Sequence, residues 1–222
     1  MSVWAVIVAA GRGERLGLDR PKAFANLRDR PLLAESLERL ENSDWVDAIV
    51  VAAPSEWEEP VILLSEELGC GKVVSAVTGG ATRAASVRAG LAEVPEDAAV
   101  VVVHDAARPV LPEEVVERVL TALNEGWDGA VPVLPIADTV KRIDRGQVVE
   151  TVDRVALGLA QTPQAFLAPV LLEAFARDGD GTDCSALVEA RGGRVKAVEG
   201  DRRLLKVTDA ADLEAVERLL SE

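Results

Sequence analysis

Apolar runs of strand length alternate with segments of helix length along most of this chain, and this alternation constrains the fold most. The expected buried strands are Val3–Val8, Ala48–Ala53, Val73–Val77, Ala99–Val103, Gly129–Val133, Arg194–Val198 and Leu204–Val207. Amphipathic segments separate these runs, which is typical of βαβ units in a mostly parallel sheet. The sequence therefore predicts an α/β fold in which helices flank a mostly parallel sheet.

Helix boundaries are marked by polar residues and prolines. Ser55-x-x-Glu58 indicates a capping box that opens a helix to about Leu68, and Thr82 begins the next helix. Pro112 is expected as the first residue of a helix that runs to about Asn124, and Asp209 as the cap of the last helix. Further helices are expected at Pro31–Leu40, Ala168–Ala176 and Asp183–Ala190.

One stretch, at about residues 136–154, has a different pattern. Thr139–Ile143 and Val148–Val152 are short strand-like runs on either side of Asp144-Arg145-Gly146, which is a hairpin signal. A two-stranded hairpin is too thin to be stable alone. We expect this β-arm to pack on a neighbour, for which a second subunit is a good candidate.

Composition limits the possible partners. The 222 residues, 49% of them hydrophobic, are enough for one domain over residues 1–222, and no low-complexity linker divides them. A formal net charge of -14 argues against nucleic acid or an anionic membrane surface as a partner. An anionic substrate must therefore meet a local cluster of cations.

The cysteines and the N-terminus favour a cytoplasmic protein. Cys70 and Cys184 are the only cysteines, which gives neither a disulfide framework nor zinc-ligand spacing, so reduced thiols are expected. No apolar run is long enough to span a bilayer. A strand is expected to begin within three residues of the start, and we expect no signal or transit peptide.

A glycine-rich basic loop follows the first strand directly. It comprises Ala9–Gly17 and continues to Pro21-Lys22, with positive charge from Arg12, Arg15 and Lys22. Glycines let successive backbone N–H groups approach an anion, so the loop predicts a triphosphate cradle, although a flexible surface turn would have the same composition.

The spacing of this loop excludes two common nucleotide motifs. Leu16 stands where a dinucleotide fingerprint requires its third glycine, and the second strand ends in Pro54-Ser55 without a ribose-binding acid. No P-loop pattern occurs. The remaining pattern is a strand, a glycine- and arginine-rich loop and then Pro21-Lys22. It resembles the signature of nucleotidylyltransferases that join a nucleoside triphosphate to a sugar or polyol phosphate.

Such a transfer needs cations and a divalent metal more than it needs a nucleophilic side chain, because the attacking phosphate oxygen is already ionised. Asp105 follows a buried strand and is a candidate Mg²⁺ ligand, or alternatively a turn or capping residue. His104 is interpreted as positioning this turn. Gly79-Gly80, with Arg83 and Ser86, is suited to reading a base edge or to a tight turn before a helix.

Nine short motifs in one order narrow the resemblance. They are A-A-G-x-G-x-R at Ala9–Arg15, P-K at Pro21-Lys22, G-G-x-x-R-x-x-S at Gly79–Ser86, H-D-A-A-R-P at His104–Pro109, D-T-V-K at Asp138–Lys141, V-D-R at Val152–Arg154, Q-T-P-Q at Gln161–Gln164, T-D at Thr182-Asp183 and K-V-T at Lys206–Thr208. Together they resemble the 2-C-methyl-D-erythritol 4-phosphate cytidylyltransferases of the non-mevalonate isoprenoid pathway, over essentially the whole chain.

This resemblance implies a Rossmann-like fold, a homodimer with an exchanged β-arm, and Mg²⁺-dependent transfer of CMP from CTP with release of pyrophosphate. By position, Arg15 and Lys22 match residues that stabilise the transition state, and Arg154 and Lys206 match residues that place the acceptor for attack. Positions that match nucleotide contacts are Ala9, Ala10, Gly11, Gly13, Gly80, Ser86 and Ala107, and positions that match metal or polyol contacts are Asp105, Arg108, Thr139 and Thr162. Thr139 is expected to reach the partner subunit's site through the arm.

Two other functions stay open at this point. A ribitol 5-phosphate cytidylyltransferase shares the loop, the H-D-A-A-R-P block and the arm, and a nucleotide-binding module without catalysis would keep the loop. Ala81, Ala85 and Cys184 depart from the family pattern, which leaves the finer contacts to cytidine open. Cys184, beside Asp183, is not expected to be a nucleophile.

Overall fold

The computed structural model describes residues 2–176, 181 and 183–221. Its core is a mixed, mostly parallel sheet in the order β10-β7-β11-β6-β1-β4-β5, with β12 also paired to β7. The strands are β1 Val3–Val8, β4 Ala48–Ala53, β5 Val73–Thr78, β6 Val100–Asp105, β7 Gly129–Pro135, β10 Gly158–Ala160, β11 Gln164–Leu167 and β12 Val195–Glu199. The predicted fold class is confirmed.

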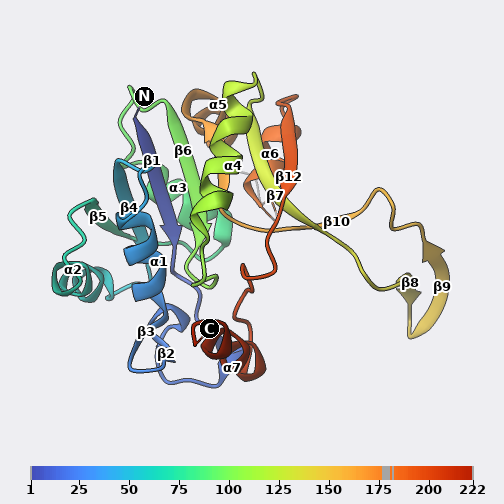
Figure 1. Cartoon of the computed structure of the whole chain (residues 1–222), viewed down its shortest axis with the longest axis horizontal. Helices are drawn as coiled ribbons and strands as arrows, with labels where there is room; N and C mark the ends of the chain where they lie inside the picture. Colours follow the sequence, from blue (N-terminus) through green and yellow to red (C-terminus); the bar gives the residue numbers. More distant parts are fainter. Residues whose placement is uncertain (1, 177–180, 182, 222) are drawn as a thin grey trace.

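Helices cover both faces of the sheet (Figure 1). One face packs on α1 Leu32–Glu41, α2 Glu58–Glu67 and α4 Glu113–Asn124, and the other on α3 Arg83–Leu91, α5 Ala168–Phe175 and α6 Cys184–Glu189. Side chains of β1 point alternately to the two faces of the sheet, since Ala5 and Ile7 lie in one core cluster and Val6 in the other. None of the helices in the described ranges is both long and apolar enough to cross a membrane.

A smaller apolar cluster holds the C-terminal helix α7, Ala210–Leu219, which lies beyond the carboxyl end of β1 (Figure 1). Buried Val216 of α7 packs there with Leu27 and Leu32, beside the short hairpin of β2 Asn26–Leu27 and β3 Arg30–Pro31. The Asp209 cap is confirmed, and it forms a full capping box with Asp212.

The segment before α7 corrects one prediction. Leu204–Val207 was expected to be a strand and is not one. The backbone N–H of Val207 bonds to the Ala107 carbonyl at 2.8 Å, but two carbonyls of this segment accept from side chains instead. Lys22 Nζ donates to the Val207 carbonyl at 3.0 Å, and Arg108 donates to the Leu204 carbonyl. The segment therefore lies beyond the sheet, at the ends of its strands.

Other boundaries also differ from the predictions. Ser55 and Glu58 form no capping box, because α2 has Trp57 at its N-cap and the Glu58 carboxylate accepts from the Thr78 hydroxyl. Pro112 is the N-cap of α4 rather than its first residue. β6 continues through His104 and Asp105, and the antiparallel strands β10 and β11 were not predicted.

The predicted hairpin is confirmed. β8 Val140–Asp144 and β9 Gln147–Val152 pair antiparallel around Arg145-Gly146, both with positive φ (46° and 83°), as a two-residue hairpin turn favours. Figure 1 shows this β-arm standing far out from the body of the molecule. Apolar side chains are exposed on it, with Ile143 65% and Val148 55% exposed.

Candidate active site

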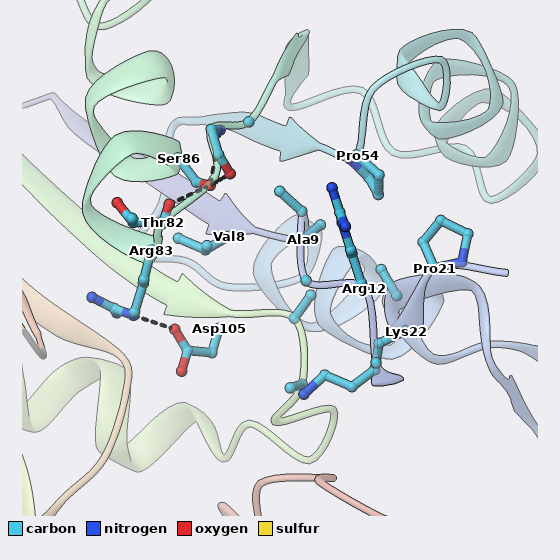
Figure 2. A pocket seen from close by; sticks show the side chains of 18 of the residues that line it. Val8, Ala9, Arg12, Pro21, Lys22, Pro54, Thr82, Arg83, Ser86 and Asp105 are labelled. Atoms are coloured by element: carbon cyan, nitrogen blue, oxygen red, sulfur yellow. Dashed lines mark hydrogen bonds and ion pairs between the residues drawn. The ribbon is translucent and has the colours of Figure 1, made fainter. Parts of the chain in front are cut away.

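A cavity of about 1000 Å³ opens at the carboxyl ends of the parallel strands. Its walls come from the loops after β1, β4 and β5, from the end of β6 and from the C-terminal segment at Lys206 and Thr208. This is the edge at which open α/β sheets bind ligands. Figure 2 shows Arg12 and Lys22 on one side of the cavity, and Arg83 and Asp105 on the other.

The glycine-rich loop needs glycine where other chain segments pass close to it. A Cβ on Gly13, whose φ is +71°, would lie 2.8 Å from the Lys22 Cβ. A Cβ on Gly79 would lie 2.4 Å from the Ala10 Cβ. The Lys22 N–H also donates to the Gly11 carbonyl at 3.2 Å. These close approaches bring the loop after β1 against Lys22 and against the loop after β5.

Lys22 places a partly buried ammonium on the cavity wall. Burial, and then the neighbouring Lys206 ammonium, lower the pKa of Lys22 from its ordinary value. Arg15 and Arg12 line the same cavity and are exposed. Cations held this close together repel one another, so an anion between them would be stabilised.

Asp105 lies between two cations at the end of β6. Its Oδ1 is 2.9 Å from Arg83 Nε and its Oδ2 is 2.7 Å from Lys206 Nζ. The residue is buried, which alone would raise its pKa, but Arg83 and Lys206 hold the pKa of Asp105 well below its usual range. The carboxylate is therefore ionised at neutral pH.

A second cavity of about 220 Å³ adjoins the first. It is lined by Arg83, Asp105, Arg108, Ala160, Gln161, Thr162, Gln164, Asp183 and Lys206. The Asp105 N–H donates to the Thr162 hydroxyl at 3.0 Å. Three residues, Arg83, Asp105 and Lys206, line both cavities and thus form their shared wall.

His104 supports this wall and does not line either cavity. It is fully buried, with Nε2 3.0 Å from the Arg108 carbonyl and Nδ1 3.3 Å from the Thr162 hydroxyl. Burial lowers the pKa of His104 to about 4, so the ring is neutral at pH 7. The interpretation that His104 positions the turn is consistent with these contacts.

The structure brings together most of the predicted site residues. The larger cavity is lined by Ala9, Ala10, Gly11, Gly13, Arg15, Lys22, Gly80, Ser86, Asp105, Ala107 and Lys206, and the smaller one by Arg108 and Thr162 as well as by Asp105 and Lys206. Thr139 and Arg154 are exposed at the β-arm and line neither cavity of their own chain. Thr182 of the T-D motif lies outside the described residues.

Sequence reasoning missed the role of Arg83. It was considered for reading a base edge, whereas its guanidinium pairs with Asp105 and donates to Cys184 Sγ at 3.4 Å. Gln164 was also underestimated: its amide nitrogen donates to the Asp183 carboxylate at 3.0 Å, and its amide oxygen accepts from the Cys184 N–H at 3.2 Å. No local pattern signals these contacts, because the partners lie far apart in the sequence.

The acidic residues that line the larger cavity are Glu14 and Asp105. In the part of the chain that the structure describes, no three His, Cys, Asp or Glu side chains cluster as metal ligands. Mg²⁺ commonly takes one or two carboxylates and completes its shell with phosphates and water. The residues present therefore fit an ion that a phosphorylated ligand would largely hold, with Asp105 as the adjacent carboxylate.

The α/β sheet carries a glycine-rich basic loop after its first strand, and Arg83 and Lys206 place two cations on the wall between the cavities. This arrangement is suited to a nucleotidyltransferase. Cations aimed at phosphates can stabilise a phosphoryl transition state without a covalent residue. Comparison with known proteins identifies the family.

The family model for 2-C-methyl-D-erythritol 4-phosphate cytidylyltransferase (IspD) matches residues 3–222. Relatives of that name include those of Saccharopolyspora erythraea, 46% identical over all of both chains, and Nocardia farcinica, 44% identical over 99% of this chain and 94% of the relative. The crystal structure of 2-C-methyl-D-erythritol 4-phosphate cytidylyltransferase from Thermus thermophilus has a TM-score of 0.82 at 33% identity, with 100% of each chain covered. This chain belongs to the IspD family.

The two buried thiols provide a test of how the structure shields its cysteines. Burial raises the pKa of Cys184 and of Cys70 to about 11 each. At pH 8, roughly one such thiol in a thousand is ionised, and both are shielded from solvent. We expect Ellman's reagent to label neither thiol of the native protein within minutes and both after denaturation. Rapid labelling of native Cys184 would contradict this environment.

Proposed function

We propose that this chain transfers CMP from CTP to 2-C-methyl-D-erythritol 4-phosphate, giving 4-diphosphocytidyl-2-C-methylerythritol and pyrophosphate in isoprenoid precursor biosynthesis. The observation that carries the proposal is the wall of Arg83, Asp105 and Lys206 shared by two cavities. The larger cavity, with Arg12, Arg15 and Lys22, suits a nucleoside triphosphate. The smaller one, with Arg108 and Lys206, suits a small phosphorylated polyol.

The reaction is a displacement at the α-phosphorus of CTP. An ionised phosphate oxygen of the acceptor forms the new P–O bond, the bond between the α- and β-phosphates breaks, and its electron pair leaves with pyrophosphate. No proton needs to be removed from the nucleophile, which agrees with a site whose histidine is buried and neutral. The protein's contribution is alignment and charge neutralisation.

Each cation has a place in this scheme. Arg15 and Lys22 line the triphosphate cavity and neutralise charge that builds up as pyrophosphate departs. Lys206 lines both cavities, so its ammonium is available to hold the acceptor's phosphate near the α-phosphate. Thr162 and Arg108 line the smaller cavity and are suited to contact the polyol.

Mg²⁺ is the cofactor that this site suits best. When bound to the triphosphate, it offsets phosphate charge and favours departure of pyrophosphate. Asp105 is the carboxylate placed to approach such an ion or its water ligands, while its own oxygens stay paired with Arg83 and Lys206.

The β-arm makes a homodimer the proposed assembly. Ile143 and Val148 expose apolar surface on a hairpin that stands apart from its own chain's core. In a dimer with exchanged arms, Thr139 and Arg154 would reach the site of the partner chain, where they would complete the acceptor pocket.

The cytoplasm is the proposed location. Both cysteines are free and buried, as in a chain that folds without disulfides, and the substrates are phosphorylated metabolites.

We expect a sedimentation mass of twice 23.5 kDa for the native protein. Val148→Lys with Ile143→Lys should shift the mass toward that of a monomer, because two added ammonium groups per arm would have to be buried. Leu63→Lys is the matched control, since Leu63 is exposed to a similar extent (56%) on α2, away from the arm. A monomeric native protein, or a dimer insensitive to the arm variant, would contradict the proposed assembly.

The acceptor is tested by measuring pyrophosphate release with CTP and Mg²⁺ while methylerythritol 4-phosphate and ribitol 5-phosphate are offered in parallel. We expect kcat/KM for methylerythritol phosphate to be higher by at least about tenfold, since an imperfect fit of one small substituent changes transition-state binding by about that factor. A preference for ribitol phosphate would keep the nucleotide chemistry and replace the acceptor.

Lys22→Ala should lower kcat by a factor of about 100 to 1000, the usual effect of removing one group that stabilises transition-state charge. Arg20→Ala is the matched control, because Arg20 is a nearby cation that pairs with Asp19 at the surface and does not line the cavity. Steady-state kinetics, with thermal unfolding of each variant, measures the difference. Equal, small effects of both substitutions would contradict the role given to Lys22.

A further inference from the structure

Arg83, Asp105 and Lys206 form a row of alternating charge across the wall between the two cavities. The Asp105 carboxylate uses Oδ1 for Arg83 Nε at 2.9 Å and Oδ2 for Lys206 Nζ at 2.7 Å. The three residues come from three elements: the first turn of α3, the end of β6 and the segment before α7. One negative charge is thus shared by two positive charges, and the row carries a net charge of +1.

The two cations differ in how far they can reach a ligand. The Lys206 side chain is 43% exposed, whereas that of Arg83 is 20% exposed and that of Asp105 8%. Arg83 is further fixed by its contact with Cys184 Sγ, and its Nη2 is buried without a partner among the described residues. Figure 2 shows the Arg83 guanidinium directed at Asp105. Lys206 is therefore the member of the row best placed to bind an anion.

The charge of Arg83 acts on Lys206 through Asp105, which lies between them. With Arg83 present, a large part of the Asp105 charge is offset from the α3 side, and the Lys206 ammonium keeps a positive potential toward the cavities. Without Arg83, Asp105 and Lys206 would form a pair with no net charge. An incoming phosphate would then compete with the Asp105 carboxylate for the same ammonium.

We propose that Arg83 is a positioning residue that offsets the charge of Asp105, and thereby keeps Lys206 available to bind the phosphate of the acceptor. The inference rests on the proposed function, because it concerns the phosphorylated acceptor of that reaction. It assigns to Arg83 an effect on acceptor binding that depends on the Asp105 charge.

The test is a double-mutant cycle between Arg83 and Asp105, read as KM for methylerythritol phosphate at saturating CTP. Arg83→Met should raise this KM by about tenfold and lower kcat by a smaller factor, since the variant weakens binding of a charged acceptor. In an Asp105→Asn background, the same substitution should change KM by less than about twofold, because no carboxylate remains to be offset. Arg83→Lys, which keeps the charge, should recover most of the loss.

Thermal unfolding of every variant, and the KM for CTP of the Arg83 variants in the wild-type background, serve as controls for the fold. An equal effect of Arg83→Met in both backgrounds, or Arg83→Lys as impaired as Arg83→Met, would overturn the proposal and leave Arg83 with a packing role. The proposed function is tested separately by the wild-type protein: if it does not use methylerythritol phosphate, that assignment fails before any variant is compared.

Discussion

Electrostatic repulsion between two phosphate-bearing substrates is the constraint on which this structure depends. A nucleoside triphosphate and a phosphorylated acceptor must be brought into contact by a chain whose own net charge is -14. The structure meets this requirement locally, by collecting Arg15, Lys22, Arg83 and Lys206 at one edge of the sheet. The Asp105 carboxylate lies among them and is shared between two of these cations.

The fold holds these charges in place through contacts between distant parts of the chain. Asp105 ends a strand whose residues are all buried, so its position is set by the core. Lys206 comes from the C-terminal segment, which Lys22 and Arg108 fasten through the carbonyls of Val207 and Leu204. Val207, next to Lys206, packs in one cluster with Val216 of α7, so α7 also helps to hold this segment, although no residue of α7 lines either cavity.

The sequence predicted the parts of this arrangement that local pattern encodes. The buried runs of β1, β4 and β6, the glycine-rich loop and the arm turn each carry their signal in adjacent residues. Leu204–Val207 was mistaken for a strand because it is a short apolar run. Its buried residues instead pack in two different clusters, Leu204 in the main core and Val207 in the cluster that includes α7. β10 and β11 are short antiparallel strands. They are defined by pairing with β7 and β6, which are distant in the sequence, so no local pattern indicates them.

In the candidate site, too, residues within local motifs could be predicted, whereas contacts between distant residues could not. Residues in the glycine loop and the H-D-A-A-R-P block could be assigned from their motifs, and the structure places them at the cavities. The partnership of Arg83 with Asp105 spans 22 positions, and that of Lys206 with Asp105 spans 101, so neither could be inferred from spacing. For Cys184, which was not expected to be a nucleophile, the structure adds a physical reason, because the thiol is fully buried beside Arg83.

The central claim is that cations and alignment carry this reaction, without a covalent intermediate on the protein. Its most direct test is to mix stoichiometric enzyme with CTP labelled in the α-phosphate and Mg²⁺, without acceptor, and to quench the mixture in denaturant. We expect no label on the protein and no burst of pyrophosphate, with rapid formation of both products once methylerythritol phosphate is added. Label retained on the protein in amounts comparable to the enzyme, or a pyrophosphate burst without acceptor, would contradict the account.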